Sequence, residues 1–150
     1  MQDVDLMHKT EIRVQWFDTD RENIVFYGNY FRFFQTGEDD FLRVAGVSRD
    51  LVKSKFNVDF TRVEAECHYK RPVKYDEVIQ VETRAAFEDE YFLTFFFRVF
   101  RKEQQELAAE GKVRTACINL GSFRIVKIPD EVRTMLENVT NWLQEGRETK

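Results

Sequence analysis

The chain has 150 residues, 43% hydrophobic and 33% charged, a composition that suits one soluble domain with a full hydrophobic core. Its formal net charge of −4, with no basic stripe or tail, argues against a nucleic-acid partner. The segment Met1–Thr10 has no apolar signal-like region, and no apolar run is long enough to span a bilayer. The sequence therefore predicts a cytoplasmic protein that does not enter a membrane.

Residue types that bind metals through sulfur or nitrogen are few and scattered. The two cysteines, Cys67 and Cys117, are far apart and lack any C-x-x-C spacing, which favours free buried thiols over a disulfide. The two histidines, His8 and His68, stand 60 positions apart by their numbers, with no clustered partners for a zinc site. We therefore expect neither a metal nor a cofactor.

The first element is predicted to be a strand over Glu11–Phe17. Ile12, Val14 and Trp16 alternate with polar residues there, which would place all three on one side of the strand. The run D-T-D-R-E-N at 18–23 follows and is rich in turn-forming residues, so we expect a loop.

A long helix is predicted from about Asn29 to Val44, because apolar residues recur on one face at helical spacing. That face comprises Tyr30, Phe33, Phe34, Gly37, Phe41, Leu42 and Ala45. Asn29 is a suitable N-cap, and Gly46 is placed to end the helix. Gly37 costs roughly 1 kcal/mol relative to Ala inside a helix, which predicts close approach of a neighbouring backbone.

After a short helical turn over Arg49–Lys55, four extended runs follow. These are Val58–Val73, Glu77–Phe87, Tyr91–Arg101 and Leu107–Leu120. The third is apolar on both sides and should be a central strand covered on both faces. A last helix is predicted from Pro129 to about Gln144. Its apolar face would comprise Val132, Met135, Leu136, Val139 and Leu143.

This order of elements predicts an α+β fold in a single domain spanning residues 1–150. The natural packing is a curved five-stranded antiparallel sheet wrapped around the first helix. The 15 phenylalanines predict a core with bulky, flat walls.

Several stretches resemble a known family. The run R-V-Q-W-F-D-T-D-x-x-x-I-V-F-Y-G-N-Y-F-R-F-F at 13–34 resembles the opening motif of hot-dog-fold acyl-CoA thioesterases of the 4-hydroxybenzoyl-CoA thioesterase type. Further matches fall in register along nearly the whole chain: F-L-R at 41–43, Y-K-R-P-V-K-Y-D-E at 69–77, E-L-A-A-E-G at 106–111 and I-P-D-E-V-R at 128–133.

The resemblance implies a hot-dog fold and an enzyme that hydrolyses an acyl-CoA thioester to a carboxylic acid and coenzyme A. It implies that Asp20 is the catalytic carboxylate, as general base on water or as nucleophile. The backbone N–H groups near Tyr27 and Gly28 would polarise the thioester carbonyl. Trp16 and Asn29 would contact the substrate. It also implies an active site at the interface of a homodimer, which in many relatives pairs into a homotetramer.

Elementary chemistry agrees with this assignment. A thioester is already activated, so one base and one oxyanion pocket suffice. A helix N-terminus supplies oriented donors and a partial positive charge where the oxyanion develops. A carboxylate beside aromatic walls is poorly solvated and therefore more basic than a free aspartate.

The chain departs from the family pattern at several places that bear on the site, among them Tyr27, where many relatives carry His, and Trp16, where many carry Tyr. Asn23 replaces the usual loop glycine and is expected to adopt a left-handed turn. The run F-E-D-E-Y-F at 87–92 is acidic where relatives often carry residues that contact coenzyme A phosphates. The phosphate contact could then lie with any of five other cations, Arg62, Lys70, Arg71, Arg98 and Arg101, among which the sequence does not choose.

Alternatives remain open at this stage. Asp20 could be only a turn-forming residue, since D-T-D clusters readily form Asx-turns, and Asp18 is interpreted as a turn or capping residue. Glu38 or Asp39 on the long helix is a rival base, although a solvated or interface face is the simpler interpretation of that charge run. An acyl-carrier-protein thioesterase and a non-catalytic acyl-CoA-binding protein are the alternative functions.

Overall fold

The structure is a computed structural model that describes the backbone of residues 8–148 and the side chains of residues 8–139. It begins with β1 (His8–Arg13), two short 3₁₀ helices, η2 (Trp16–Asp18) and η3 (Tyr27–Asn29), and the long helix α1 (Tyr30–Val44). The remaining elements are α2 (Arg49–Phe56), β2 (Val58–Tyr69), β3 (Val78–Phe87), β4 (Phe92–Arg101), β5 (Glu106–Asn119) and α3 (Asp130–Glu148).

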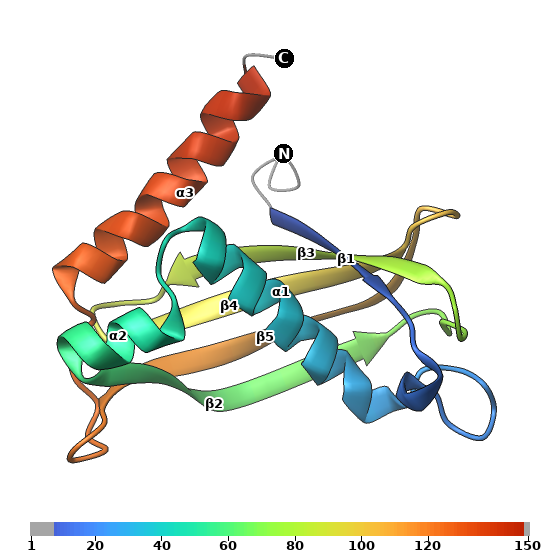
Figure 1. Cartoon of the computed structure of the whole chain (residues 1–150), viewed down its shortest axis with the longest axis horizontal. Coiled ribbons are helices and arrows are strands. Elements are labelled where there is room, and N and C mark those ends of the chain that lie inside the picture. Colours follow the sequence, from blue (N-terminus) through green and yellow to red (C-terminus); the bar gives the residue numbers. More distant parts are fainter. Residues whose placement is uncertain (1–7, 149–150) are drawn as a thin grey trace.

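The five strands form one antiparallel sheet in the order β1-β3-β4-β5-β2, with β4 in the centre. Helix α1 lies obliquely across one face of this curved sheet (Figure 1). The predicted α+β architecture is confirmed, including the central position of the strand that is apolar on both sides.

Phenylalanine rings fill the space between α1 and the sheet. The Phe34 ring of α1 stacks on Phe97 of β4, with ring centroids 4.5 Å apart and planes 3° from parallel. Phe41, about two turns further along α1, meets Phe95 edge-on at 6.3 Å. Since all four side chains are at most 2% exposed, the aromatic face of the helix is held firmly against the centre of the sheet.

The first strand is shorter than predicted. It ends at Arg13, and residues 16–18 form the turn η2 because the Asp18 carboxylate accepts the Gln15 N–H at 2.8 Å while the Asp18 N–H returns to the Gln15 carbonyl. Trp16 consequently does not share a buried face with Val14; its side chain is 76% exposed, whereas Val14 is fully buried.

Strand β2 also differs from its predicted course. It ends at Tyr69, because the next two N–H groups, of Lys70 and Arg71, both turn to the Ala108 carbonyl. A bulge between Arg62 and Glu64 interrupts the alternation of sides. Arg62, just before this bulge, reaches Glu38 of α1 at 2.7 Å.

The C-terminal helix α3 packs through its first half and then projects away from the sheet (Figure 1). Val132, Leu136 and Val139 are buried, whereas the predicted contact of Leu143 lies outside the described side chains. Within the described chain, no helix combines the length and the apolar character needed to cross a bilayer.

Candidate active site

A short hairpin-like loop carries the predicted catalytic carboxylate. Thr19 bridges to Val25, and the Asp20 N–H donates to the Ile24 carbonyl at 2.8 Å. Asn23 closes the loop in a left-handed conformation, with φ of 64°, as predicted. The loop thus returns the chain directly from η2 to the start of the next helix.

The carboxylate of Asp20 is only partly engaged. Its Oδ1 accepts the Glu22 N–H at 2.8 Å, which is the Asx-turn that a loop aspartate commonly forms. Among the described residues, Oδ2 has no hydrogen-bond or ion-pair partner, and the residue is partly exposed. One oxygen therefore orients the carboxyl group, and the other remains available to a water molecule or a substrate.

The returning arm of the loop leads into a helix start with free donors. The Phe26 N–H donates to the Asp18 carbonyl, and the Asn29 N–H donates to the Phe26 carbonyl. Between them, the N–H groups of Tyr27 and Gly28 have no acceptor in the described part of the chain. Since η3 runs directly into α1, these donors stand at the positive end of a continuous helical segment.

Asp18 is the structural centre of this junction. Its carboxylate is 1% exposed and forms an ion pair with Arg32 of α1, in addition to the bond from the Gln15 N–H. Its carbonyl oxygen accepts the Phe26 N–H and the Asn29 side-chain amide, each at 2.8–2.9 Å. Asp18 therefore has the turn-forming role expected for it and ties the loop to the helix.

Asn29 stands at the N-cap position of α1 as predicted, but its side chain does not cap the helix. Its backbone is helical, with φ −74° and ψ −12°, and its side chain makes no capping bond. The reason is that the helical path begins earlier, at η3, so the Asn29 amide is free to donate to Asp18 instead. Substrate contact by Asn29 and Trp16 stays a prediction.

Large aromatic side chains are exposed around this junction. Trp16 and Phe17 are each 76% exposed and Tyr27 is 66% exposed. Phe26 and Tyr69 are also exposed, at 44% and 47%. We call these five residues the aromatic surface. The Phe26 and Tyr69 rings both contact the Tyr27 ring, so at least part of the surface is continuous.

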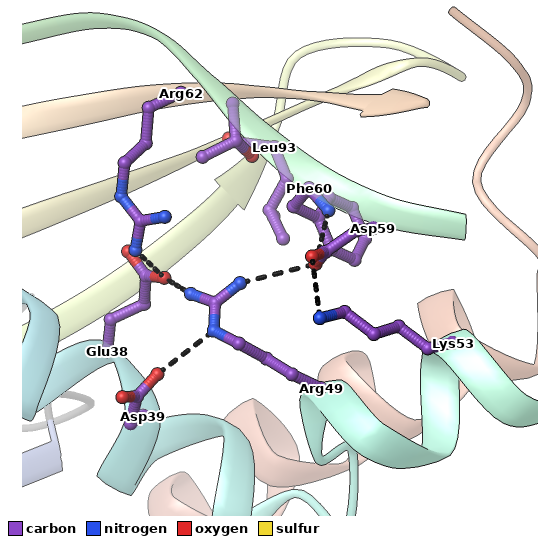
Figure 2. A network of polar contacts seen from close by, with 9 residues as sticks. Glu38, Asp39, Arg49, Lys53, Asp59, Phe60, Arg62 and Leu93 are labelled. Carbon is purple, nitrogen blue, oxygen red and sulfur yellow. Dashed lines mark hydrogen bonds and ion pairs between the residues drawn. The ribbon is translucent and has the colours of Figure 1, made fainter. Parts of the chain in front are cut away.

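The rival carboxylates on α1 belong to a different site. Glu38 is 1% exposed and is ion-paired with both Arg49 and Arg62, the latter at 2.7 Å (Figure 2). Asp39 and Asp59 bind other nitrogens of the same Arg49 guanidinium, at 3.1 and 3.4 Å. The interpretation of Glu38 as a solvated charge is therefore wrong.

This arrangement also counts against Glu38 as a base. A substrate cannot reach a fully buried carboxylate whose charge is already matched by two guanidinium groups. No local sequence pattern indicates this network, because the two arginines lie 11 and 24 residues away from Glu38.

The acidic hairpin at 87–92 serves the fold. The Glu88 carboxylate accepts Arg114 Nε at 2.8 Å and the Thr94 hydroxyl at 2.7 Å, and these two bonds hold its pKa below the usual range. The Asp89 carboxylate accepts hydrogen bonds from the N–H groups of Tyr91 and Phe92, where β4 begins. Its carbonyl accepts Arg133 of α3. These acids therefore hold the hairpin and α3 in place.

Four of the five candidate phosphate contacts are already paired with carboxylates. Arg62 binds Glu38; the other pairs are Arg98 with Glu82, Arg101 with Glu77 and Glu106, and Arg71 with Glu106, the last at 3.6 Å. Lys70 is exposed, and its ammonium group has no carboxylate partner among the described residues. Lys70 directly follows Tyr69 of the aromatic surface.

Three surface hollows lie elsewhere on the molecule. One adjoins the Arg49 network, one lies between β1 and the β4–β5 turn, and a third of about 480 Å³ lies between α1 and α3, lined by Val44, Ala45, Met135, Asn138 and Val139. None of these three is lined by Asp20, Tyr27 or Gly28.

Comparisons with known proteins place the chain in a family. The family model described as the thioesterase-like superfamily matches residues 14–136. A protein of Aquifex aeolicus named as a candidate esterase is 31% identical over 126 residues, which cover 84% of this chain and 94% of that protein. The acyl-CoA thioesterase YbgC of Haemophilus influenzae is 23% identical over 128 residues, covering 85% of this chain and 93% of the relative.

A solved structure shows the same fold. The DHNA-CoA thioesterase of Staphylococcus aureus superposes with a TM-score of 0.82 at 21% identity, covering 93% of this chain and 95% of that one. The fold, the matched span and the two relatives agree with the resemblance found in the sequence. The chain belongs to the thioesterase-like superfamily of thioester hydrolases and has their hot-dog fold.

Proposed function

We propose that the protein hydrolyses acyl-CoA thioesters to a carboxylic acid and free coenzyme A, with Asp20 as general base or nucleophile. The observation that carries this proposal is the pairing of a carboxylate with one free oxygen and a helix start with two free N–H groups on the same short loop. Family membership supports the reaction class, and the name of the Haemophilus relative supports coenzyme A as the carrier.

The chemistry requires two groups. With Asp20 as base, its carboxylate takes a proton from water while the oxygen of that water attacks the thioester carbon. The N–H groups of Tyr27 and Gly28 would stabilise the negative charge that develops on the carbonyl oxygen. Collapse of the tetrahedral intermediate breaks the carbon–sulfur bond, and the departing thiolate of coenzyme A takes up a proton.

We further propose that the working form is a homodimer or homotetramer with the site at an interface between copies. The aromatic surface is too apolar and too exposed for a finished site on a lone subunit, which supports a second copy beside it. Strand β2 lies at the edge of the sheet, and such an edge can pair with another strand. The cytoplasmic location and the single-domain organisation remain predictions.

The decisive experiment measures thiol release from a panel of aliphatic and aromatic acyl-CoAs. We expect Asp20→Asn to lower turnover by roughly 10²–10⁴-fold, the usual contribution of a positioned acid or base. Glu22→Gln is the matched control, because it removes the charge of an exposed carboxylate in the same loop. It should retain activity. Wild-type turnover in Asp20→Asn would show that Asp20 is only a turn residue.

A further inference from the structure

We propose that Tyr69 is a positioning residue that orients and strengthens the N–H donor of Gly28, an inference that rests on the proposed function. The Tyr69 hydroxyl, at the end of β2, donates a hydrogen bond of 2.9 Å to the carbonyl oxygen of Tyr27. The two residues are 42 positions apart, so this bond joins the edge of the sheet to the start of the helix.

The bond acts on Gly28 because the Tyr27 carbonyl and the Gly28 N–H belong to one peptide unit. In a trans peptide, the oxygen and the hydrogen point in opposite directions from a rigid plane. No cis peptide occurs among the described residues. Fixing the Tyr27 oxygen therefore fixes the direction in which the Gly28 N–H points.

The same bond polarises the amide. A hydrogen bond accepted by a carbonyl withdraws electron density from its own N–H and makes that N–H a stronger donor, by about 10–30% per bond in condensed-phase estimates. The Tyr30 N–H also reaches the Tyr27 oxygen from within the helix. Tyr69 therefore adds a second donor to this oxygen, from outside the helix.

Packing holds the Tyr69 hydroxyl where this role needs it. Its ring lies edge-on to the Tyr30 ring at 5.2 Å and to the Tyr27 ring at 6.5 Å. Its backbone is in register with Ala109 of β5, which is completely buried. The sheet thus serves as a rigid reference for the donor at the helix start.

The hydroxyl also keeps the proton that it donates. Although Tyr69 is 47% exposed as a whole, its partial burial, followed by the neighbouring Cys67 thiol, raises the pKa of Tyr69 to about 12. At neutral pH the oxygen therefore acts as a donor to the carbonyl, and loss of the proton would occur only in strongly alkaline solution.

The test is Tyr69→Phe, which removes the hydroxyl and retains the ring contacts. We expect kcat to fall roughly tenfold, less than the 10²–10³ that follows removal of a whole oxyanion donor, because the Gly28 N–H remains but is weaker and less well aimed. KM should stay within about twofold, since the donor acts mainly on the charge that develops during reaction. Tyr75→Phe, at another exposed tyrosine, is the control and should keep wild-type kcat.

A spectroscopic readout separates positioning from a purely structural tie. The acyl-CoA that wild type hydrolyses fastest is labelled with ¹³C at its thioester carbonyl and bound to Asp20→Asn, which hydrolyses it slowly. The infrared band of that carbonyl should move to higher wavenumber when Tyr69→Phe is added, because the carbonyl is then less polarised. A structural tie would lower the melting temperature and leave the band in place.

The outcomes are distinct. A fall in kcat with a shifted band supports the inference. An active wild type with unchanged kcat in Tyr69→Phe, or with a lower kcat and an unmoved band, overturns it and leaves the proposed function standing. Absence of thiol release by wild type from every acyl-CoA overturns both together.

Discussion

Arg32 of α1 forms an ion pair with the buried carboxylate of Asp18, and this pair connects η2 to the first turn of the long helix. The guanidinium also lies over the Phe33 ring, with its central carbon 5.0 Å from the ring centroid. The loop that carries Asp20 begins directly after Asp18, at Thr19. The start of this loop is therefore fixed to the long helix, and the N–H groups just before that helix are the proposed oxyanion donors.

We expect Arg32→Met to lower the free energy of unfolding by roughly 1–3 kcal/mol, because it leaves a buried charged acceptor short of a partner. Arg43→Met is the matched control on the same helix. Arg43 is 72% exposed and pairs with Asp40 at 3.2 Å, so its loss should cost about 0–1 kcal/mol. Denaturant unfolding of the two variants measures the difference, and equal losses would contradict the structural importance of the Asp18 pair.

The Glu38 network predicts that substitution of Glu38 lowers the free energy of unfolding without lowering the catalytic rate. Glu38→Gln leaves Arg49 and Arg62 without their central carboxylate, and removing one partner of a buried ion pair costs roughly 3–5 kcal/mol. Because Arg62 is 40% exposed, the lower part of that range is expected. Asp39→Asn, at a carboxylate 36% exposed, should cost about 0–1 kcal/mol.

Turnover of Glu38→Gln, measured well below its melting temperature, should stay close to that of wild type. A 10²-fold or larger drop, with roughly the stability of wild type, would instead mark Glu38 as the base.

Periodicity and composition were sufficient to predict the α+β fold, the long helix and the central strand. Apolar residues at helical spacing indicated α1, and a run apolar on both sides indicated β4. The errors at Trp16, Asn29 and Glu38 have a common physical cause. Each depends on a bond whose geometry the pattern does not contain: a 3₁₀ turn closed by Asp18, an early helix start at η3, and arginines from two other elements.

The candidate site was predictable only in part. The sequence indicated the left-handed turn at Asn23 and the junction between loop and helix, because both depend on neighbouring residues. Tyr69 stood in a matched motif, but its bond to Tyr27 spans the distance from the edge of the sheet to α1 and needs the fold to be known. The choice of Lys70 among the five phosphate-binding candidates likewise needed the structure, because only the structure shows that the other four are engaged in ion pairs.

Lys70 is predicted to contact a phosphate of the substrate, given the proposed function. Lys70→Ala should raise KM for an acyl-CoA roughly three- to tenfold and leave KM for the matching acyl-pantetheine, which lacks the phosphates, unchanged. High salt should reduce the difference, because it screens an exposed charge pair. Lys127→Ala, 60% exposed beside the acidic hairpin, is the control. An equal rise in KM for both substrates would contradict a phosphate contact.

From the hydrogen bonds of Asp40 we predict how the free energy of unfolding changes at low pH. Burial opposes its ionised form, but hydrogen bonds from His8 at 2.6 Å and Thr10 at 2.7 Å outweigh it and hold the pKa of Asp40 below its usual value. A lowered folded-state pKa stabilises the fold fully above the unfolded value of about 3.9. That stabilisation is lost as the pH falls through the folded value, since the unfolded state binds the proton first.

We therefore expect wild type to lose more stability than Asp40→Asn between about pH 5 and pH 2. Unfolding free energies measured across this range for both proteins provide the comparison. Parallel acid dependences would show that Asp40 has no lowered pKa in the fold.

Gly37 lies where α1 packs against β3, and its near neighbours there are side chains rather than the backbone that the sequence suggested. A Cβ at this position would lie 2.5 Å from the Thr83 hydroxyl oxygen and 2.9 Å from Val81 Cγ1. In an unobstructed helix, Gly→Ala would stabilise by roughly 1 kcal/mol. Here we expect Gly37→Ala to destabilise instead, because overpacking a core typically costs about 1–3 kcal/mol.

A double-mutant cycle with Thr83→Ala isolates the contact. The Thr83 hydroxyl is buried and has no hydrogen-bond partner among the described residues, so its removal forfeits no bond seen there and opens space for the new methyl group. The double variant should therefore be more stable than the sum of the two single changes predicts, by more than about 0.5 kcal/mol. Additive losses would mean that the cost of Gly37→Ala arises elsewhere, at Val81 or through movement of the whole helix.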